Sequence, residues 1–211
     1  MRFVALAIGY CLGLFQTGFI YGKTKGIDIR QHGSGNAGAT NTLRTLGFKA
    51  GAITFAGDCL KAVLSIIIVK LLFQDTFADD IKVLEMYAGF GTVLGHNFPF
   101  YLKFKGGKGI ACTAGVACAV CPAAVPVCLT VFVLCFALSR YVSLGSILMC
   151  LLFIIQVLLF NYYGILGIAE ENILEFNILA FLFSALAIWR HRANIVRLIN
   201  GTENKIEKKA K

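Results

Sequence analysis

The residues best suited to chemistry gather in one short polar stretch between two long apolar runs. Residues 31–44 read Gln-His-Gly-Ser-Gly-Asn-Ala-Gly-Ala-Thr-Asn-Thr-Leu-Arg. Glycine allows positive φ and a close approach of the backbone to a ligand, and backbone N–H groups that converge in this way bind anions. Serine, asparagine and threonine add side-chain donors, and Arg44 adds a planar cation suited to phosphate. The stretch predicts a phosphate-binding loop; a flexible connection that caps the next helix is the alternative.

Three further stretches carry basic or hydroxyl side chains and few acidic groups. They are Lys103–Gly109, which reads Lys-Phe-Lys-Gly-Gly-Lys-Gly, then Arg140–Ser143 and Arg190–Arg197. Each borders an apolar run long enough to span a membrane. A site formed by these stretches would present anion donors beside an apolar interior, which suits an amphiphile with a phosphate head and an acyl tail.

Several familiar catalytic patterns are missing. The segment Lys105–Lys108 lacks the G-x-x-x-x-G-K-[ST] spacing of a nucleotide-binding loop, because glycine follows the last lysine. Five residues after His32, His96 and His191 stand alanine, tyrosine and valine, so there is no His-x-x-x-x-Asp dyad. No Ser-His-Asp set is recognisable either. The sequence therefore gives no sign of a nucleotide-binding loop or of a nucleophilic triad.

Eight cysteines are spread through the apolar runs. Cys118 and Cys121 make the one C-x-x-C pair, and no second pair or nearby histidine completes a metal site. A cysteine in an apolar helix packs as a small hydrophobic residue. We therefore expect no metal ion, no disulfide and no cofactor.

The composition indicates a membrane protein. The 211 residues are 58% hydrophobic and 15% charged, against about 45–50% and about 25% in a soluble domain. The net charge of +9 could indicate a nucleic-acid partner, which would require basic residues on a soluble surface. Here they flank apolar runs instead, as in a membrane topology signal. We expect one integral membrane domain over 1–203, a basic, disordered tail over 204–211, and no nucleic-acid partner.

The apolar runs predict an all-α protein that crosses the membrane about seven times. The expected spans are 3–21, 50–73, 83–102, two short helices within 110–138, 144–163 and 173–189. The run 110–138 is too long for one untilted span, and Pro122 and Pro126 interrupt it. Two helices that enter and return keep every basic stretch on one face, whereas a single kinked helix is the alternative. The positive-inside rule then places the N-terminus outside and the C-terminus in the cytoplasm.

Two charged residues lie inside the second apolar run. Asp58 and Lys61 are three residues apart and hence on one helix face. Charges within a span are costly and usually face the protein interior or a polar cavity. A buried ion pair that orients helices and a role in a site are both consistent with this spacing.

Three ordered motifs resemble a known family, the bacterial acyl-phosphate:glycerol-3-phosphate acyltransferases (the PlsY family). The first motif is Ser-Gly-Asn-Ala-Gly-Ala-Thr-Asn at 34–41. The second is Gly-His-Asn-Phe-Pro at 95–99, leading to Phe-Lys-Gly-Gly-Lys-Gly at 104–109. The third is His-Arg-Ala-Asn-Ile-Val-Arg-Leu at 191–198, followed by Gly-Thr-Glu at 201–203. The resemblance runs from the first span to about residue 203.

The resemblance implies a reaction and a location. A fatty acyl phosphate would give its acyl group to the sn-1 hydroxyl of glycerol 3-phosphate, yielding lysophosphatidic acid and phosphate without a cofactor. The missing nucleophile triad agrees, because phosphate is already a good leaving group and no acyl-enzyme is needed. Members work in the bacterial cytoplasmic (inner) membrane, facing the cytoplasm, and are functionally linked to an enzyme that forms acyl phosphate.

The resemblance also implies residue roles. We expect the acyl phosphate to be bound by Gly35, Asn36, Gly38, Ala39, Thr40, Asn41 and Ser143. Glycerol 3-phosphate binding and catalysis are expected from Ser34, Arg44, Lys105, His191 and Asn194. A supporting role is expected for His96, Gly106, Gly107, Lys108 and Arg192. The proton of the acceptor hydroxyl could pass to His191 or to a phosphate oxygen of the donor.

A transporter of organophosphates is the alternative function. It would share the apolar spans and basic groups, but transporters usually show an internal repeat and none is visible here. A structural scaffold would not need glycine and serine in these polar stretches. The acyltransferase interpretation is therefore preferred.

Overall fold

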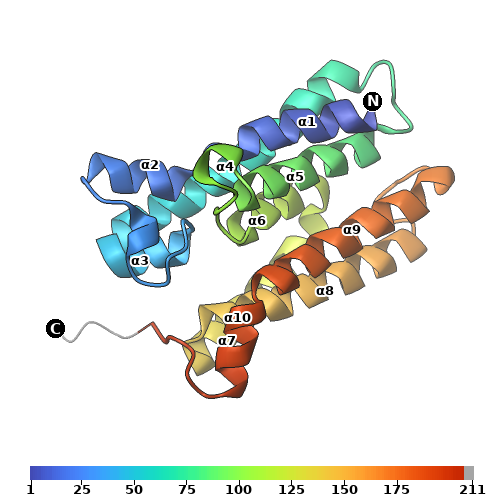
Figure 1. Cartoon of the computed structure of the whole chain (residues 1–211). Helices are drawn as coiled ribbons and strands as arrows, with labels where there is room; N and C mark the ends of the chain where they lie inside the picture. The colour runs from blue at the N-terminus through green and yellow to red at the C-terminus, as the bar shows by residue number, and fades with distance from the viewer. Residues whose placement is uncertain (207–211) are drawn as a thin grey trace.

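The computed structural model describes residues 1–206 as an all-helical bundle, with no strand in that range (Figure 1). Short 3₁₀ turns at Ile29–Gln31, Phe100–Leu102 and Pro122–Ala124 connect some of the helices. The α-helices are α1 (Arg2–Gly13), α2 (Thr17–Thr24), α3 (Ala39–Leu46), α4 (Phe48–Phe73), α5 (Ile81–Asn97), α6 (Ile110–Val120), α7 (Val125–Ser139), α8 (Val142–Tyr162), α9 (Glu170–Arg190) and α10 (Arg192–Ile199).

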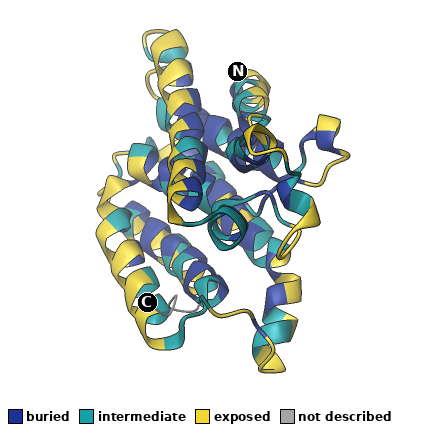
Figure 2. Cartoon of the chain, turned by 90° about the vertical axis from the view of Figure 1, so that its left-hand side faces the viewer, coloured by how far each residue is buried: buried dark blue, intermediate teal, exposed yellow. Residues whose placement is uncertain are grey.

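Within the described residues, five helical segments are long and apolar enough to cross a membrane: Arg2–Thr24, Phe48–Phe73, Pro122–Ser139, Val142–Tyr162 and Glu170–Arg190. Helix α5 has 17 residues and α6 has 11, so both are shorter than these segments. Large apolar side chains such as Leu71, Leu138 and Phe181 point outward, and Figure 2 shows exposed residues along the outer faces of the helices. The predicted all-α, multi-pass class is confirmed, whereas the count of seven crossings and the orientation remain predictions.

The two ends of the bundle differ in charge. At one end Arg2 forms ion pairs with Glu175 at 2.6 Å and with Asp80 at 3.2 Å. The start of α1 therefore contacts both acidic segments, the loop between α4 and α5 and the start of α9. Helix α10 lies at the opposite end (Figure 1), where Arg44 of α3 also donates to the Asn204 carbonyl. This arrangement separates the acidic turns from the glycine-rich stretches, as the charge pattern of the sequence predicts.

Helices α1 and α5 pack at very close range through glycines. Gly9 and Gly13 on α1 face the backbone of α5, and Gly91 and Gly95 on α5 face the backbone of α1. A Cβ atom at any of the four would overlap a carbonyl oxygen of the other helix. Small residues four apart are a known means of bringing membrane helices together. The close contact fixes the end of α5, which carries His96, against the end of α1.

The run 110–138 forms two helices, as predicted. Helix α6 ends at Val120, Pro122 begins a 3₁₀ turn, and α7 continues from Val125. The start of α6 at Ile110 and Phe132 on α7 line the same cavity. The chain therefore leaves this cavity along α6 and comes back to it along α7.

Three expectations need correction or refinement. The predicted first span lies within Arg2–Thr24, which is long and apolar enough to cross a membrane, but its helix is interrupted, because α1 ends at Gly13 and α2 begins at Thr17. The predicted phosphate loop is helical from Ala39 onward. In the predicted tail, Asn204 accepts a hydrogen bond from Arg44 and Ile206 donates one to the Arg140 carbonyl, while residues 207–211 lie outside the described range.

Candidate active site

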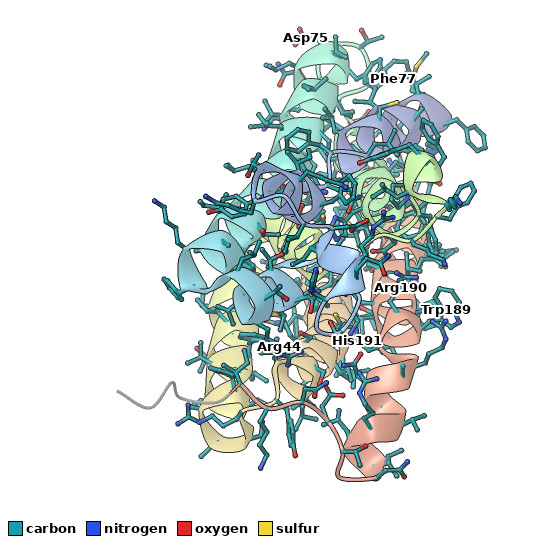
Figure 3. The ribbon with its side chains drawn as sticks, turned by 60° about the vertical axis from the view of Figure 1, so that its left-hand side comes forward. Arg44, Asp75, Phe77, Trp189, Arg190 and His191 are labelled. Atoms are coloured by element: carbon teal, nitrogen blue, oxygen red, sulfur yellow. The ribbon has the colours of Figure 1, made fainter. Side chains whose placement is uncertain are left out.

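A cavity of about 140 Å³ lies where the glycine-rich and basic stretches meet. Most of the predicted site residues line it, although they come from four separate parts of the sequence. Figure 3 shows Arg44, Arg190 and His191 in one part of the molecule, away from Asp75 and Phe77 at the other end. The predicted residues that line the cavity are Ser34, Asn36, Gly38, Ala39, Thr40, Asn41, Arg44, His96, Lys108, Ser143, His191 and Asn194.

Five predicted residues are not part of the lining: Gly35, Lys105, Gly106, Gly107 and Arg192. Lys105 and Arg192 are exposed, and the Arg192 guanidinium stacks over the Trp189 ring at 4.4 Å. Their assigned roles remain predictions. The two glycines instead form the turn that delivers Lys108 to the cavity.

The N-terminus of α3 forms one wall. The backbone N–H of Thr42 makes the first intrahelical bond, to Gly38 at 3.1 Å. The N–H groups of Ala39, Thr40 and Asn41 precede it and have no acceptor within the helix. All three residues line the cavity. A helix N-terminus is a ready anion site, because its N–H groups and its dipole both favour negative charge. The predicted phosphate-binding loop therefore consists of a loop through Gly38 and the N-terminus of α3 from Ala39 onward.

The Asn41 side chain organises this loop from within. Its amide nitrogen donates to the carbonyls of Ile29, His32 and Asn36 at 2.8–3.0 Å. Its amide oxygen accepts from the Ser34 N–H at 2.8 Å. These four bonds hold the loop in a fixed shape before a ligand arrives. Its predicted contact with acyl phosphate therefore has to come from the backbone N–H of Asn41.

Two side-chain donors at the cavity lack a partner within the described chain. The Nε atom of Arg44 and the Oγ atom of Ser143 are buried and make no hydrogen bond to residues 1–206. Another nitrogen of the Arg44 guanidinium, Nη2, donates to the Asn204 carbonyl at 2.9 Å. Buried polar groups normally have partners. Both residues line the cavity, so an anionic ligand with acceptor oxygens would satisfy them.

The second motif forms a tight turn fixed from three sides. The N–H of Gly107 donates to the His96 carbonyl at 3.1 Å, and Arg190 donates to the Gly107 carbonyl at 2.7 Å. Asn36 donates to the Gly106 carbonyl at 3.4 Å, which joins the first motif to the second. A Cβ on Gly106 or Gly107 would overlap the carbonyl or ring of His96. Glycine is required here for space rather than for a positive φ.

Lys108 and Asn194 join the second and third motifs. The Lys108 ammonium donates to the Asn194 side-chain oxygen, and the Asn194 amide donates to Glu203 at 3.0 Å. Glu203 in turn accepts from Arg197 at 2.9 Å. Burial lowers the pKa of Lys108 to about 8. Its positive charge is thus held in a poorly solvated place, where an anion would be a strong partner.

His191 lies between α9 and α10 with its ring buried in the cavity wall. The Nδ1 atom is 2.7 Å from the Ala187 carbonyl, so it carries the proton and Nε2 is the free acceptor. Burial, and then the charge of Lys108, lower the pKa of His191 to about 4. The imidazole is therefore neutral at pH 7 and able to accept a proton.

Sequence reasoning assigned no role to several residues that the structure brings to the cavity. Glu203 belongs to the third motif, and Asp58 stood out in the sequence as a charged residue within an apolar run. Ser146 follows Ser143 by three residues and thus shares its helix face. The apolar part of the lining had no signal in the sequence; it includes Phe55, Ile110, Phe132 and Val142.

Through residue 206, the fold and the site define an all-helical membrane protein with a cavity at one end of its bundle that is lined by basic and hydroxyl side chains. The sequence model of the family described as Glycerol-3-phosphate acyltransferase matches residues 3–201. A glycerol-3-phosphate acyltransferase of Alkaliphilus metalliredigens (strain QYMF) is 44% identical over 210 residues, covering 99% of this chain and 98% of the relative. That of Bacillus subtilis (strain 168) is 39% identical over 203 residues, covering 96% of each.

A solved structure agrees. The crystal structure of PlsY (YgiH), an integral membrane glycerol 3-phosphate acyltransferase, in its glycerol 3-phosphate form has a TM-score of 0.82 and 35% identity, over 98% of this chain and 96% of that one. The chain belongs to the glycerol-3-phosphate acyltransferase family, as its motifs indicated.

The Lys108 environment predicts an alkaline limit to substrate capture. The ammonium is charged below its pKa of about 8 and loses its charge above it, so kcat/KM for the phosphate-bearing acceptor should fall above about pH 8. Lys108→Arg keeps its charge at higher pH, so the pH at which kcat/KM falls should rise by more than about one unit. Lys103→Arg, an exposed lysine outside the cavity, is the matched control. If kcat/KM of Lys108→Arg fell at the same pH as in the wild type, the fall would not be caused by loss of the Lys108 charge.

Proposed function

We propose that this enzyme transfers a fatty acyl group from an acyl phosphate to the sn-1 hydroxyl of glycerol 3-phosphate. The products are lysophosphatidic acid and inorganic phosphate. The observation that carries the proposal is the set of unpartnered anion donors at a cavity that also has an apolar wall. The related PlsY structures are described as glycerol 3-phosphate and lysophosphatidic acid forms, which supports this acceptor and this product.

The chemical step is a direct acyl transfer. The acceptor oxygen forms a bond to the acyl carbonyl carbon, and the bond from that carbon to the phosphate oxygen breaks. Phosphate leaves with the electron pair of that bond. The hydroxyl proton passes to Nε2 of His191 or to a phosphate oxygen of the donor. His191 is suited to this role because its Nδ1–H is held by Ala187 and Nε2 is free to accept.

The cavity would accelerate this step mainly by positioning and electrostatic stabilisation. The N–H groups at the start of α3 and the Ser143 hydroxyl would hold the acyl phosphate, whose leaving oxygen gains negative charge. Arg44, Lys105 and Asn194, with Ser34 and His191, would hold glycerol 3-phosphate. The Lys105 side chain is exposed on the turn that carries Lys108, so its contact requires the flexible chain to reach toward the cavity.

The acyl chain would leave the cavity through its apolar wall. Phe55 on α4 lines the cavity and is 48% exposed on the outer face of the bundle. Phe132 on α7 lines the cavity near α8. An acyl chain lying along these rings would stay in the hydrocarbon of the membrane while its phosphate enters the polar side. In this arrangement the membrane hydrocarbon would solvate the acyl chain of the donor while the donor is bound.

We further propose that the cavity faces the cytoplasm of a bacterial inner membrane, where an acyl-phosphate-forming enzyme would supply the donor. The basic stretches at the cavity end and the acidic turns at the other end support this orientation. Lys205→Cys, at the cavity end, should react with an impermeant thiol reagent only from the cytoplasmic side. Thr76→Cys, exposed at the other end, should react only from outside. The reverse labelling pattern would overturn the orientation.

The donor is tested with purified protein in detergent. Acyl phosphate should be consumed with release of phosphate, and this release should depend on glycerol 3-phosphate. Acyl-CoA should stay intact, because no His-x-x-x-x-Asp dyad is present to serve a thioester. The control omits the acceptor and measures hydrolysis alone. Turnover of acyl-CoA at a comparable rate would contradict the proposed donor.

A further inference from the structure

After α10 the chain turns back toward the cavity. Gly201 follows the helix with a φ of 69°, a left-handed conformation that glycine adopts at little cost. The residues from Glu203 to Ile206 have no regular secondary structure; we call residues 203–206 the C-terminal strap. Figure 3 shows Arg44 close to this last described part of the ribbon. The proposed reaction so far assigns the strap no role.

The carboxylate of Glu203 fixes the start of the strap. It is 7% exposed and accepts hydrogen bonds from Asn194 at 3.0 Å and from Arg197 at 2.9 Å. Both donors lie on α10. Pulling a buried carboxylate away from two donors is costly, so the strap begins at a fixed point beside α10.

Two contacts fix the other end of the strap to the segment between α7 and α8. The Ile206 N–H donates to the Arg140 carbonyl at 3.2 Å. The Lys205 ammonium lies 5.3 Å from the centre of the Tyr141 ring. This segment leads into Ser143, which lines the cavity. The strap therefore crosses from α10 to the start of α8.

Between its two ends the strap contacts Arg44. The Nη2 atom of the guanidinium donates to the Asn204 carbonyl at 2.9 Å on the exposed side. The Nε atom of the same group is buried and makes no hydrogen bond to residues 1–206. A guanidinium is planar and rigid, so holding Nη2 also limits the directions that Nε–H can take. Arg44 lines the cavity, and the strap leaves its inner donor for a ligand.

A backbone carbonyl is a suitable partner for this purpose. A long arginine side chain loses conformational freedom when it is ordered, and a contact that orders it in advance reduces the cost of binding. The Asn204 carbonyl has no net charge, so it orients Arg44 without neutralising it. Arg30 is the contrasting case, because its guanidinium pairs with the Asp28 carboxylate at 2.7 Å.

We propose that the C-terminal strap is a positioning element for Arg44, whose guanidinium the Asn204 carbonyl orients toward the phosphate of glycerol 3-phosphate. For the identity of this ligand the proposal rests on the proposed function. The strap acts through Arg44 and has no contact of its own with the phosphate. A change in the strap should therefore alter the affinity for glycerol 3-phosphate only while Arg44 is present.

The first test lengthens the strap. Two glycines inserted after Glu203 leave its carboxylate in place and move the Asn204 carbonyl away from Arg44. The dissociation constant of glycerol 3-phosphate, measured by calorimetry, should rise about tenfold, because the hydrogen bond to the charged phosphate loses its fixed donor. The matched control carries the same insertion after Ile206 and should stay within about threefold of the wild type. An unchanged constant in the first variant, or an equal rise in the control, would overturn the proposal.

A second test separates positioning from a general loss of structure. The insertion after Glu203 is combined with Arg44→Lys, which already lacks the guanidinium. Two changes that act on one interaction are not additive, so the insertion should change the dissociation constant of Arg44→Lys by no more than about threefold. A further tenfold rise in that background would show that the strap acts by another route and would contradict the proposal.

A point substitution tests the anchor of the strap. Ile206→Pro removes the N–H that donates to the Arg140 carbonyl, whereas Ile206→Ala keeps it. Ile206→Pro should raise the dissociation constant of glycerol 3-phosphate by about threefold or more relative to Ile206→Ala. Equal constants for the two variants would count against the anchor and hence against the strap.

The outcomes distinguish this proposal from the proposed function. If Arg44→Lys weakens glycerol 3-phosphate binding and the insertion after Glu203 does not, the strap proposal alone is wrong. If both changes weaken binding as expected but purified protein transfers no acyl group from acyl phosphate, the proposed function is wrong and the positioning of Arg44 stands.

Discussion

A charge placed beside an apolar interior must find a partner, and this constraint governs the whole cavity. Both of its carboxylates are paired: Asp58 with Lys61 at 3.0 Å and Glu203 with Arg197 at 2.9 Å. The donors of Arg44 and Ser143, by contrast, have no complete set of partners within residues 1–206. The protein thus neutralises its own negative groups and leaves donors for negative groups that arrive with the substrates.

The polar atoms of the site come from places where helices are interrupted. The break between α1 and α2 frees carbonyls for Lys61, the start of α3 supplies free N–H groups, and the junction of α9 and α10 holds His191. The long helices α4, α8 and α9 provide apolar surface and fix these interruptions in space. A bundle of uninterrupted helices would satisfy its backbone internally and leave few groups for a phosphate.

Much of this arrangement was predictable from the sequence, because motif residues and apolar runs are local properties. The all-helical class, the two helices within 110–138 and the gathering of Ser34, Arg44 and His191 follow from composition, proline positions and the resemblance. The break at 14–16 did not, because an apolar run looks the same whether it is continuous or broken. The helix that begins at Ala39 has eight residues and lies in a polar stretch, so no apolar run marked it as a helix. The partners of Lys61 are set by tertiary contacts with α1 and α5, which no local pattern records.

The central claim is that fixed donors in this cavity hold the phosphate of glycerol 3-phosphate. The most direct test is the dissociation constant of glycerol 3-phosphate for Arg44→Lys, measured by calorimetry. Arg30→Lys is the matched control, because Arg30 binds Asp28 at 2.7 Å and lies outside the cavity lining. Losing the guanidinium fork should cost about 1.5–3 kcal/mol, or roughly a 10- to 150-fold weaker affinity. The control should stay within about threefold, and equal affinities for wild type and Arg44→Lys would contradict the account.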